Sequence, residues 1–293
     1  MCTGVKYRQT MGRNYDYEKS FNEQIIRINQ NEYENRYDVI GIGTGMVQDY
    51  PLLYDGMNEH GLCVCGLAFA NNAKYYPYQE GKSNVAAFDF TFYVLGHYKS
   101  VSEFIDYFDQ INIWCEPFSD KMPNSPLHWL ICDMERSIVI ESTEKGLHWY
   151  DAETGVLTNN PPYPEQIHEY HFNKSFIGGE GIEYKDKRWE SRGLATNGLD
   201  GSYTSDERFE RISFLKEKLE DTNCIFNQAS QTFHLLASVE QIYGATPVGE
   251  DYEYTIYSAV YDMETLKVYI KKYNDLSYGL FSLHDTSLHR YTF

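Results

Sequence analysis

The sequence has few basic residues and no long apolar run. It carries 25 Lys and Arg against 43 Asp and Glu, which gives a net charge of −18. Nucleic acids and anionic membrane surfaces both attract basic patches, so this charge argues against either as a partner. No apolar stretch approaches the roughly 20 residues of a membrane span, and the polar N-terminus is unlike a signal peptide. We therefore expect a cytoplasmic protein without stable membrane association.

Several binding motifs are missing as well. No CxxC pair occurs, which fits a reducing compartment; the six cysteines are Cys2, Cys63, Cys65, Cys115, Cys132 and Cys224. The glycine-rich GIGTG at 41–45 is not followed by a helical pattern and does not predict a nucleotide-binding loop. HEYH at 168–171 lacks the HExxH spacing of a zinc site. We expect neither a cofactor nor a metal.

What is present is a series of segments typical of strands. Six runs are rich in β-branched and aromatic residues: 37–47, 61–69, 127–134, 136–142, 252–263 and 265–273. Turn-forming residues at 58–61 (NEHG), 133–136 (DMER) and 262–265 (DMET) predict hairpins between them. No repeat or linker-like stretch divides the chain, so residues 1–293 are expected to form a single domain.

Four segments have helical patterns: 88–98, 100–111, 205–222 and 227–242. Ser100 and Glu103 have the spacing of a capping box, and Ser205 is the expected N-cap of the third helix. Runs of adjacent strands with a few helices predict an α+β fold in which helices cover antiparallel sheet.

The chain opens with MCTG, which places a cysteine directly after the initiator methionine. Initiator methionine is normally removed before a small residue, so we expect the mature chain to start at Cys2. One residue would then carry both a thiol nucleophile and an α-amine that titrates near neutral pH and can move the proton. The alternative interpretation is an exposed cysteine of no consequence.

GRNYDYE follows closely and contains Arg13 and Asp16. A guanidinium stabilises a thiolate, and a carboxylate can orient an α-ammonium. Residues three apart in a regular strand point to opposite faces, so we expect a bend or bulge near Asn14–Tyr15 if both side chains are to reach Cys2. As an exposed ion pair, the same two residues would contribute almost nothing to stability.

Two more residues are unexpected on structural grounds. Asn159, in VLTNNPPYP (156–164), carries an amide that can donate to an oxyanion, although turn formation explains an asparagine there equally well. Arg208 would lie in the first turn of the 205–222 helix, where the helix dipole favours acidic residues. It could also be a neutral surface residue.

Taken in order, these segments resemble the choloylglycine hydrolase family, which contains bile salt hydrolases and penicillin V acylases. The matching segments are MCTG, GRNYDYE, DYPLLYDGMNEHGL, SPLHWLICD, GVLTNNPPY, SDERFERISFL and EYTIYS. The resemblance implies the N-terminal nucleophile hydrolase fold, a four-layer αββα sandwich of two antiparallel sheets flanked by helices. It also implies that Cys2 is the nucleophile, that Arg13 and Asp16 activate it, that Asn159 contributes to the oxyanion hole and that Arg208 is a second active-site arginine. Homotetramers are common among relatives, which implies a homotetramer or homodimer here.

The sequence departs from the family pattern in GLAFANNAKY. Ala68 stands where bile salt hydrolases typically carry Asn and penicillin V acylases typically carry Tyr, so the usual indicator of selectivity is absent. The backbone N–H of Ala68 can still serve the oxyanion hole. Asn71 and Asn72 are expected near the mouth of the substrate pocket. The hairpin between Cys2 and Arg13 is shorter than in better-known members, which bears on the rim of that pocket.

The resemblance thus implies an amidohydrolase that cleaves a linear secondary amide through a thioester on Cys2. Glycine- or taurine-conjugated bile salts are the leading substrates, and penicillin V or N-acyl homoserine lactones are the alternatives. From a different class, the chain could be a catalytically silent binding protein with the same fold.

Overall fold

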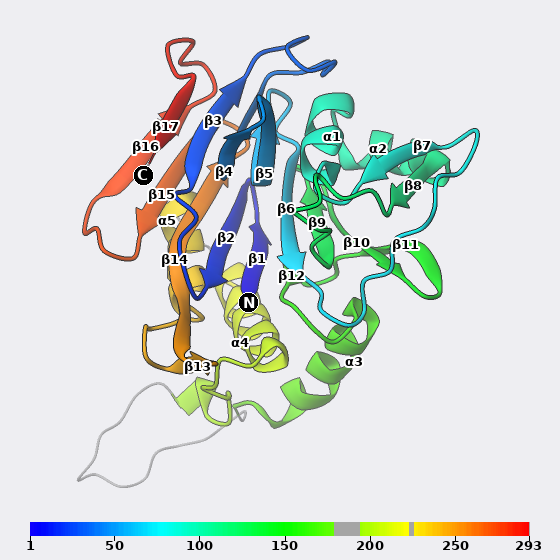
Figure 1. Cartoon of the computed structure of the whole chain (residues 1–293). Coiled ribbons are helices and arrows are strands. Elements are labelled where there is room, and N and C mark those ends of the chain that lie inside the picture. The colour runs from blue at the N-terminus through cyan, green and yellow to red at the C-terminus, as the bar shows by residue number, and fades with distance from the viewer. Residues whose placement is uncertain (179–193, 223–225, 293) are drawn as a thin grey trace, which may run out of the picture.

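The structure is a computed structural model that describes residues 1–178, 194–222 and 226–292. At its centre, two antiparallel sheets are stacked face to face (Figure 1). In the first sheet the strand order is β12-β1-β2-β14-β15-β16, with β13 paired to β14. Its strands are β1 (Cys2–Tyr7), β2 (Thr10–Tyr17), β12 (Val156–Leu157), β13 (Thr246–Val248), β14 (Asp251–Asp262), β15 (Lys267–Lys272) and β16 (Tyr278–Ser282).

The second sheet has the strand order β11-β10-β9-β6-β5-β4-β3-β17. Its strands are β3 (Gln24–Ile28), β4 (Val39–Val47), β5 (Tyr50–Asn58), β6 (Cys63–Ala68), β9 (Leu127–Cys132), β10 (Ser137–Thr143), β11 (Gly146–Asp151) and β17 (Arg290–Thr292). A separate parallel pair consists of β7 (Ser83–Ala86) and β8 (Ile111–Trp114).

Helices cover the outer faces of both sheets. The α-helices of the described residues are α1 (Phe90–His97), α2 (Val101–Tyr107), α3 (Tyr163–Asn173), α4 (Ser205–Glu220) and α5 (Gln228–Ala237). Short 3-10 turns follow at Phe108–Gln110, Lys174–Phe176 and Leu194–Thr196. Helices α4 and α5 pack against the first sheet and α1 packs against the second. These layers confirm the predicted α+β fold with an αββα order.

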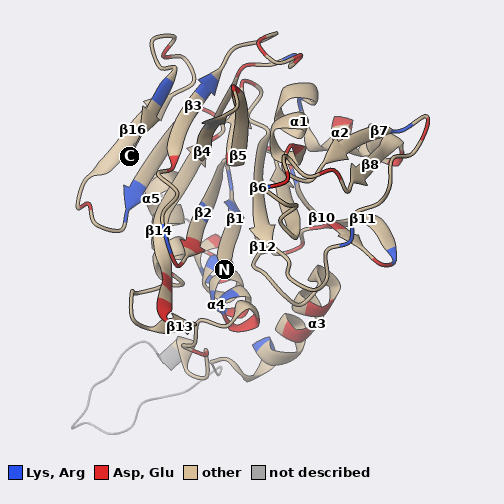
Figure 2. Cartoon of the chain, in the orientation of Figure 1, with Lys and Arg blue, Asp and Glu red and all other residues tan. Residues whose placement is uncertain are grey.

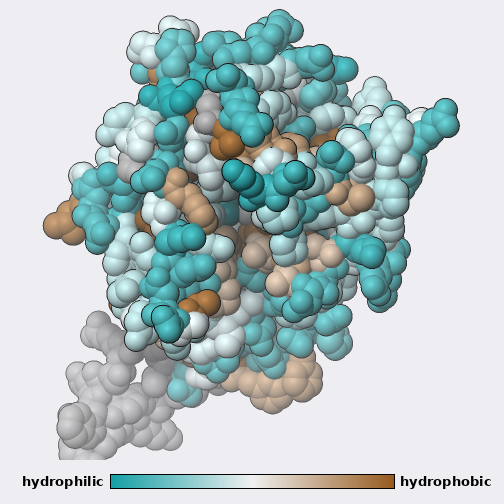
Figure 3. Space-filling view, in the orientation of Figure 1, coloured by the Kyte–Doolittle hydropathy of each residue, from teal (hydrophilic) through white to brown (hydrophobic). Residues whose placement is uncertain are grey.

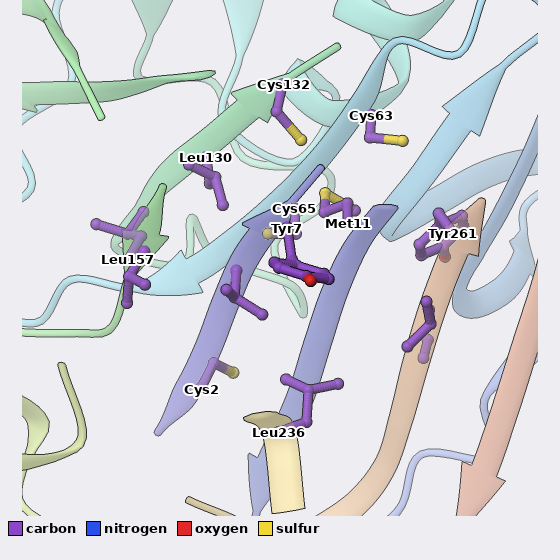
Figure 4. Packing of buried hydrophobic residues seen from close by; sticks show 14 of the residues in the cluster. Cys2, Tyr7, Met11, Cys63, Cys65, Leu130, Cys132, Leu157, Leu236 and Tyr261 are labelled. Carbon is purple, nitrogen blue, oxygen red and sulfur yellow. The ribbon is translucent and has the colours of Figure 1, made fainter. Parts of the chain in front are cut away.

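The space between the sheets is filled by apolar side chains (Figure 4). Tyr7 and Met11 of the first sheet lie against Cys65 and Leu130 of the second, and all four are buried. A Cβ on Gly4 would lie 2.8 Å from the Cys65 Sγ, so a glycine there allows β1 to approach β6 closely. This close packing fixes β1, which carries the N-terminal residues, against the second sheet.

The predicted hairpins are confirmed. NEHG connects β5 to β6, DMER connects β9 to β10, and DMET connects β14 to β15. The Ser100 side chain accepts a hydrogen bond from the Glu103 N–H at 3.1 Å, as the capping-box spacing predicted.

Two local predictions differ from the structure. Ser205 is the first residue of α4 and not its N-cap; its hydroxyl instead accepts a hydrogen bond from the Asn159 N–H at 2.7 Å. Helix α3, which contains HEYH, was not predicted, because polar residues and two prolines at its start hide the helical pattern. The N-cap position is taken by Thr204, one residue earlier, and the Ser205 side chain is used in the contact with Asn159.

None of the described helices is both long enough and apolar enough to cross a membrane. Five of the six cysteines lie in the described part of the chain and are unpaired there, and Cys224 lies outside it.

Candidate active site

Cys2, the first residue of β1, lies at the wall of a cavity of about 480 Å³. The cavity is lined mainly by apolar and aromatic side chains from β2, β5, the segment between β7 and α1, and the segment from β8 to the start of β9, among them Leu52, Tyr54, Phe88, Phe118 and Leu127. Apolar residues also gather around the middle of this face in the space-filling view (Figure 3). Pockets of a few hundred Å³ with such walls are typical sites for small amphipathic ligands.

The thiol of Cys2 faces the Arg13 guanidinium. Arg13 Nη2 donates to Cys2 Sγ at 3.5 Å and to the Gly66 carbonyl at 2.7 Å, while Nη1 forms an ion pair with Asp55 at 2.6 Å. Arg13 is only 1% exposed, so this cation is held in a water-poor environment. There it stabilises a thiolate far more strongly than an exposed arginine would.

Asp55 in turn is held by two tyrosine hydroxyls from β14. Tyr257 donates to one carboxylate oxygen at 2.6 Å and Tyr261 donates to the other. Burial and the neighbouring Asp55 raise the pKa of both tyrosines well above the usual range, so both hydroxyls stay protonated and act as donors. The carboxylate of Asp55 is therefore fully bonded, and it fixes the direction of the Arg13 side chain.

The bend expected near Asn14–Tyr15 is not on β2, which runs unbroken from Thr10 to Tyr17. The irregularity lies on the neighbouring strand, where the register of β14 shifts between Thr255 and Tyr257. Alternation along β2 directs Arg13 toward the second sheet and Asp16 toward the opposite face. The prediction of a bend was wrong because Arg13 alone reaches the Cys2 thiol, whereas the Asp16 carboxylate is bonded to Thr255 and Gln241 on the other face.

Asp16 lies beside the chain terminus rather than beside the thiol. Its carboxylate accepts hydrogen bonds from Thr255 Oγ1 at 2.6 Å and from Gln241 Nε2 at 3.0 Å. Burial raises the pKa of Asp16, while Arg208, the terminal ammonium and these two hydrogen bonds act in the opposite direction. A charged terminus close to this buried carboxylate is thus favoured.

Met1 is also held in place. Its carbonyl accepts from the Asp16 N–H at 3.1 Å, its ammonium donates to the Asp16 carbonyl at 3.1 Å, and that ammonium lies 2.5 Å from Glu253. Met1 lines the cavity together with Cys2. Loss of Met1 would therefore open one wall of the cavity and leave the Cys2 nitrogen as a free amine.

Asn159 and Arg208 contact the backbone of Cys2 from the other side. The Cys2 N–H donates to Asn159 Oδ1 at 2.8 Å, and Arg208 Nη2 donates to the same oxygen at 2.8 Å. Arg208 Nη1 donates to the Cys2 carbonyl at 2.7 Å and to Thr3 Oγ1 at 2.6 Å. Arg208 has no exposed surface, so it is not a neutral surface residue.

Of the three residues predicted at the substrate pocket, Ala68 lines the cavity, whereas Asn71 and Asn72 do not. Asn159 Nδ2 donates to the Ala68 carbonyl at 2.8 Å, and Ala68 lines the cavity. Asn71 and Asn72 lie in the turn after β6 and are not among the residues that line the cavity around Cys2. Asn72 instead donates to Asn160 Oδ1 at 3.1 Å.

Sequence reasoning missed the residues that support the site from behind. Asp55, Thr255 and Tyr257 all lie within the segments DYPLLYDGMNEHGL and EYTIYS, in which the sequence does not distinguish them from their neighbours. Gln241 lies outside these segments and carried no signal. Buried polar residues inside an otherwise strand-like run were the available clue, because such residues need partners.

Chemically, this arrangement supports nucleophilic catalysis by a thiol. It combines a thiol, a buried guanidinium and a side-chain amide around one residue. Within residues 1–178, 194–222 and 226–292, no cluster of three or more His, Cys, Asp or Glu side chains could hold a metal ion.

Comparison with known proteins shows what this chain is similar to. Residues 2–291 match the family described as linear amide C–N hydrolases, choloylglycine hydrolase family. The chain is 38% identical to a bile salt hydrolase/transferase of Lactiplantibacillus plantarum over 98% of this chain and 94% of that protein. It is 33% identical to one of Clostridium perfringens, over 94% and 90% of the two chains.

Two solved structures show the same arrangement of elements. A conjugated bile acid hydrolase from Clostridium perfringens has a TM-score of 0.90 and 29% identity, with 100% of this chain and 97% of that chain covered. A penicillin V acylase from Agrobacterium tumefaciens has a TM-score of 0.74 and 16% identity, covering 97% and 87% of the two chains, which shows the shared fold alone.

Proposed function

Because the chain belongs to the choloylglycine hydrolase family of linear amide C–N hydrolases, we propose that it cleaves glycine- or taurine-conjugated bile salts, with Cys2 as an N-terminal nucleophile. The observation that carries this proposal is that relatives 38% and 33% identical over nearly the whole chain are named bile salt hydrolase/transferase. The thiol of Cys2 at the wall of a largely apolar cavity supports it.

The reaction begins after removal of Met1. The free α-amine of Cys2 takes the thiol proton, and the thiolate attacks the carbonyl carbon of the substrate amide. The negative oxygen of the tetrahedral intermediate accepts hydrogen bonds from Asn159 Nδ2 and the backbone N–H of Ala68. When the C–N bond breaks, the α-ammonium gives its proton to the departing amine, and the acyl group remains as a thioester on Cys2.

Water completes the cycle. The α-amine takes a proton from water as the oxygen attacks the thioester carbonyl, and the same oxyanion donors stabilise the second intermediate. Collapse of this intermediate releases the acid and returns the thiol. Throughout, no cofactor is needed.

The neighbours of Cys2 have separate roles in this proposal. Arg13, 3.5 Å from the sulfur, stabilises the thiolate. Asp16 orients the α-ammonium, and its hydrogen bonds to Thr255 and Gln241 keep its carboxylate in place. Arg208 holds the Cys2 carbonyl and Asn159 Oδ1, which directs Asn159 Nδ2 toward the Ala68 side of the site.

The cavity fits an amphipathic substrate. Leu52, Leu53, Phe88, Phe118 and Leu127 provide apolar walls suited to a steroid ring system. Burial of rings against such walls supplies binding energy far from the bond that breaks. The alanine at position 68 adds no polar group to select among acyl chains.

Three further points belong to the proposal. Residues 1–293 act as one domain, which is supported by a continuous core that includes both Cys2 and Leu283. The chain works in the cytoplasm, which its unpaired cysteines fit. It assembles as a homodimer or homotetramer, and sedimentation equilibrium would test this directly.

The test is to incubate the wild-type protein and Cys2→Ala in parallel with glycocholate, taurocholate and penicillin V, each alone, and to identify products by mass spectrometry. We expect cholate with glycine or taurine from the wild type and none from Cys2→Ala. Cys2→Ser should fold but retain little activity, because a hydroxyl ionises far less readily than a thiol. Undiminished turnover by Cys2→Ala would refute the proposed mechanism, and release of phenoxyacetate alone would assign the protein to the penicillin V acylases.

A further inference from the structure

A buried histidine–glutamate pair lies behind the segment that carries Asn159. His128 on β9 and Glu141 on β10 are 0% and 1% exposed, and His128 Nδ1 lies 3.1 Å from Glu141 Oε1. Neither side chain is among those that line the cavity at Cys2. The acyl-transfer steps proposed above use neither residue, so this buried ionisable pair requires a separate explanation.

The pair holds both ends of the segment from Thr158 to Tyr163. His128 Nε2 lies 2.9 Å from the Thr158 carbonyl, and the Tyr163 N–H donates to Glu141 Oε1 at 2.9 Å. Asn159 lies inside this segment, directly after Thr158. The position of its side-chain amide therefore depends on where the pair anchors the backbone.

The same histidine contacts the strand that carries Ala68. Its ring stacks on Phe69 with centroids 4.2 Å apart and an angle of 7° between the planes. Leu67, on the other side of Ala68, is paired with His128 in the sheet. The imidazole thus contacts the chain neighbour of each residue assigned as an oxyanion donor, namely Thr158 beside Asn159 and Phe69 beside Ala68.

The hydrogen-bond partners of His128 fix the orientation of its ring. A carbonyl oxygen can only accept, so Nε2 must donate to Thr158. Nδ1 faces Glu141 Oε1 at 3.1 Å, and the same oxygen accepts from the Tyr163 N–H. The ring is therefore fixed at both of its nitrogens.

We propose that His128 and Glu141 are positioning residues that set the geometry of the oxyanion hole. By fixing the Thr158 carbonyl, the Tyr163 N–H and the Phe69 ring together, they hold Asn159 Nδ2 and the Ala68 N–H at a constant separation. This inference rests on the proposed function, since it assigns those two groups as the donors. It adds two residues that touch neither substrate nor thiol.

The test uses His128→Phe, which keeps an aromatic ring for Phe69 but removes both ring nitrogens. We expect kcat for glycocholate to fall about 100-fold, with KM changed less than about threefold, because the lost geometry matters only in the transition state. Alkylation of Cys2 by iodoacetamide, which forms no oxyanion, should keep its wild-type rate. A merely structural defect would slow both reactions.

Two further variants keep the test decisive. Glu141→Gln retains an acceptor for the Tyr163 N–H and a polar partner for His128 Nδ1, so we expect it to keep most of the wild-type kcat. His128→Gln, which keeps one donor, covers the case in which His128→Phe does not fold, and its kcat should lie between those of His128→Phe and the wild type.

His148→Gln is the matched control, because His148 is an exposed residue paired with Glu141 across β10 and β11.

The inference is overturned if folded His128→Phe, or folded His128→Gln in its place, keeps the wild-type kcat. It is equally overturned if alkylation of Cys2 slows in parallel with kcat. Failure of the wild-type protein to hydrolyse any conjugated bile salt would instead refute the proposed function. The two failures are therefore distinguishable in one set of measurements.

Discussion

At the scale of single residues, β2 presents Arg13 and Asp16 on its two opposite faces. Arg13 reaches the Cys2 sulfur from the side facing the second sheet, and the Asp16 carboxylate is bonded to Thr255 and Gln241 on the other side. Strand alternation alone produces this division. In the proposed mechanism the thiol and the α-amine of Cys2 project from the residue in different directions. Neighbours on both faces of β2 suit such a nucleophile.

Thr255→Val should move the acid limb of the pH profile to higher pH. In the proposed mechanism Asp16 orients the α-ammonium only when ionised, so activity should be lost as pH falls through its pKa. Burial already raises the pKa of Asp16, and the hydrogen bond from Thr255 opposes that rise. Removing the hydroxyl therefore raises this pKa further. The measurement is kcat/KM for glycocholate against pH for the variant and the wild type.

Ser258→Ala provides the control for this profile. Ser258 lies on the same strand as Thr255, but its hydroxyl donates to Asn14 Oδ1 at 2.7 Å. Its acid limb should coincide with that of the wild type. An unchanged or lowered limb in Thr255→Val would contradict the role given to Asp16.

The sequence alone relates Cys2 to its chain neighbours more readily than to the residues packed behind it. Cys2, Arg13 and Asp16 are close in the chain, so their relation to one another could be reasoned out locally. Asp55 and Gln241 act through contacts that join residues 42 and 225 positions apart in the chain. No local pattern reveals such pairs, because only the stacking of strands and helices brings them together.

At the scale of elements, the contact of α5 with β2 depends on a glycine. A Cβ at Gly12 would lie 2.5 Å from Thr232 Cγ2 and 3.0 Å from Leu236 Cδ1, both on α5. Gly12→Ala should therefore lower the free energy of unfolding by about 1–3 kcal/mol. Urea unfolding measures this loss.

Gly201→Ala is the matched control, because nothing lies within 4 Å of the Cβ it would add. We expect its free energy of unfolding to stay within about 0.5 kcal/mol of the wild type. Equal stability of the two variants would show that α5 does not pack on β2 as closely as described.

A carboxyl group directly before α1 lowers the free energy of unfolding when it ionises. Burial raises the pKa of Asp89, which precedes α1, to about 6, although Tyr50 O–H donates to it at 2.6 Å. An acid with a raised pKa contributes stability at low pH that is lost as pH rises, here between about 4 and 6. Asp89→Asn keeps an acceptor for Tyr50 and stays neutral.

Asp89→Asn should therefore be more stable than the wild type at pH 7.5 by about 2 kcal/mol, a value reduced for its partial exposure. Near pH 4 the two proteins should be equally stable. Urea unfolding at both pH values measures the difference. A variant that is less stable at pH 7.5 would contradict this account of Asp89.

Secondary structure followed from sequence where local chemistry decides it. The hairpins at 58–61, 133–136 and 262–265 depend on turn residues between apolar runs, and all three formed. Helix α3 depends on tertiary contacts instead, since buried Tyr163 and Tyr170 anchor an otherwise polar segment. Ser205 failed as a cap for the same reason, because its hydroxyl is bonded to Asn159.

At the scale of the whole molecule, the net charge of −18 should oppose an anionic substrate. Acidic residues lie on β14, α3 and α4 around the N-terminus (Figure 2). Raising ionic strength from about 0.01 to 0.15 M shortens the screening length from about 30 to 8 Å. KM for glycocholate, measured below its micellar concentration, should therefore fall severalfold with salt while kcat stays constant.

The methyl ester of glycocholate is the control for this effect, because it keeps the steroid and the amide but has no charge. Its KM should change little with salt. A KM for glycocholate that rises with ionic strength would show that local positive charge at the site outweighs the net charge of the molecule.

The proposed mechanism depends most on an N-terminal Cys2 that becomes acylated. The most direct measurement is the intact mass of the active protein, taken first alone and then within milliseconds of mixing with excess glycocholate. We predict a chain that begins at Cys2 and then gains the mass of a cholyl group, with no such gain in Cys2→Ala. A fully active protein that retains Met1, or turnover of glycocholate with no acylated species at any time, would contradict the account.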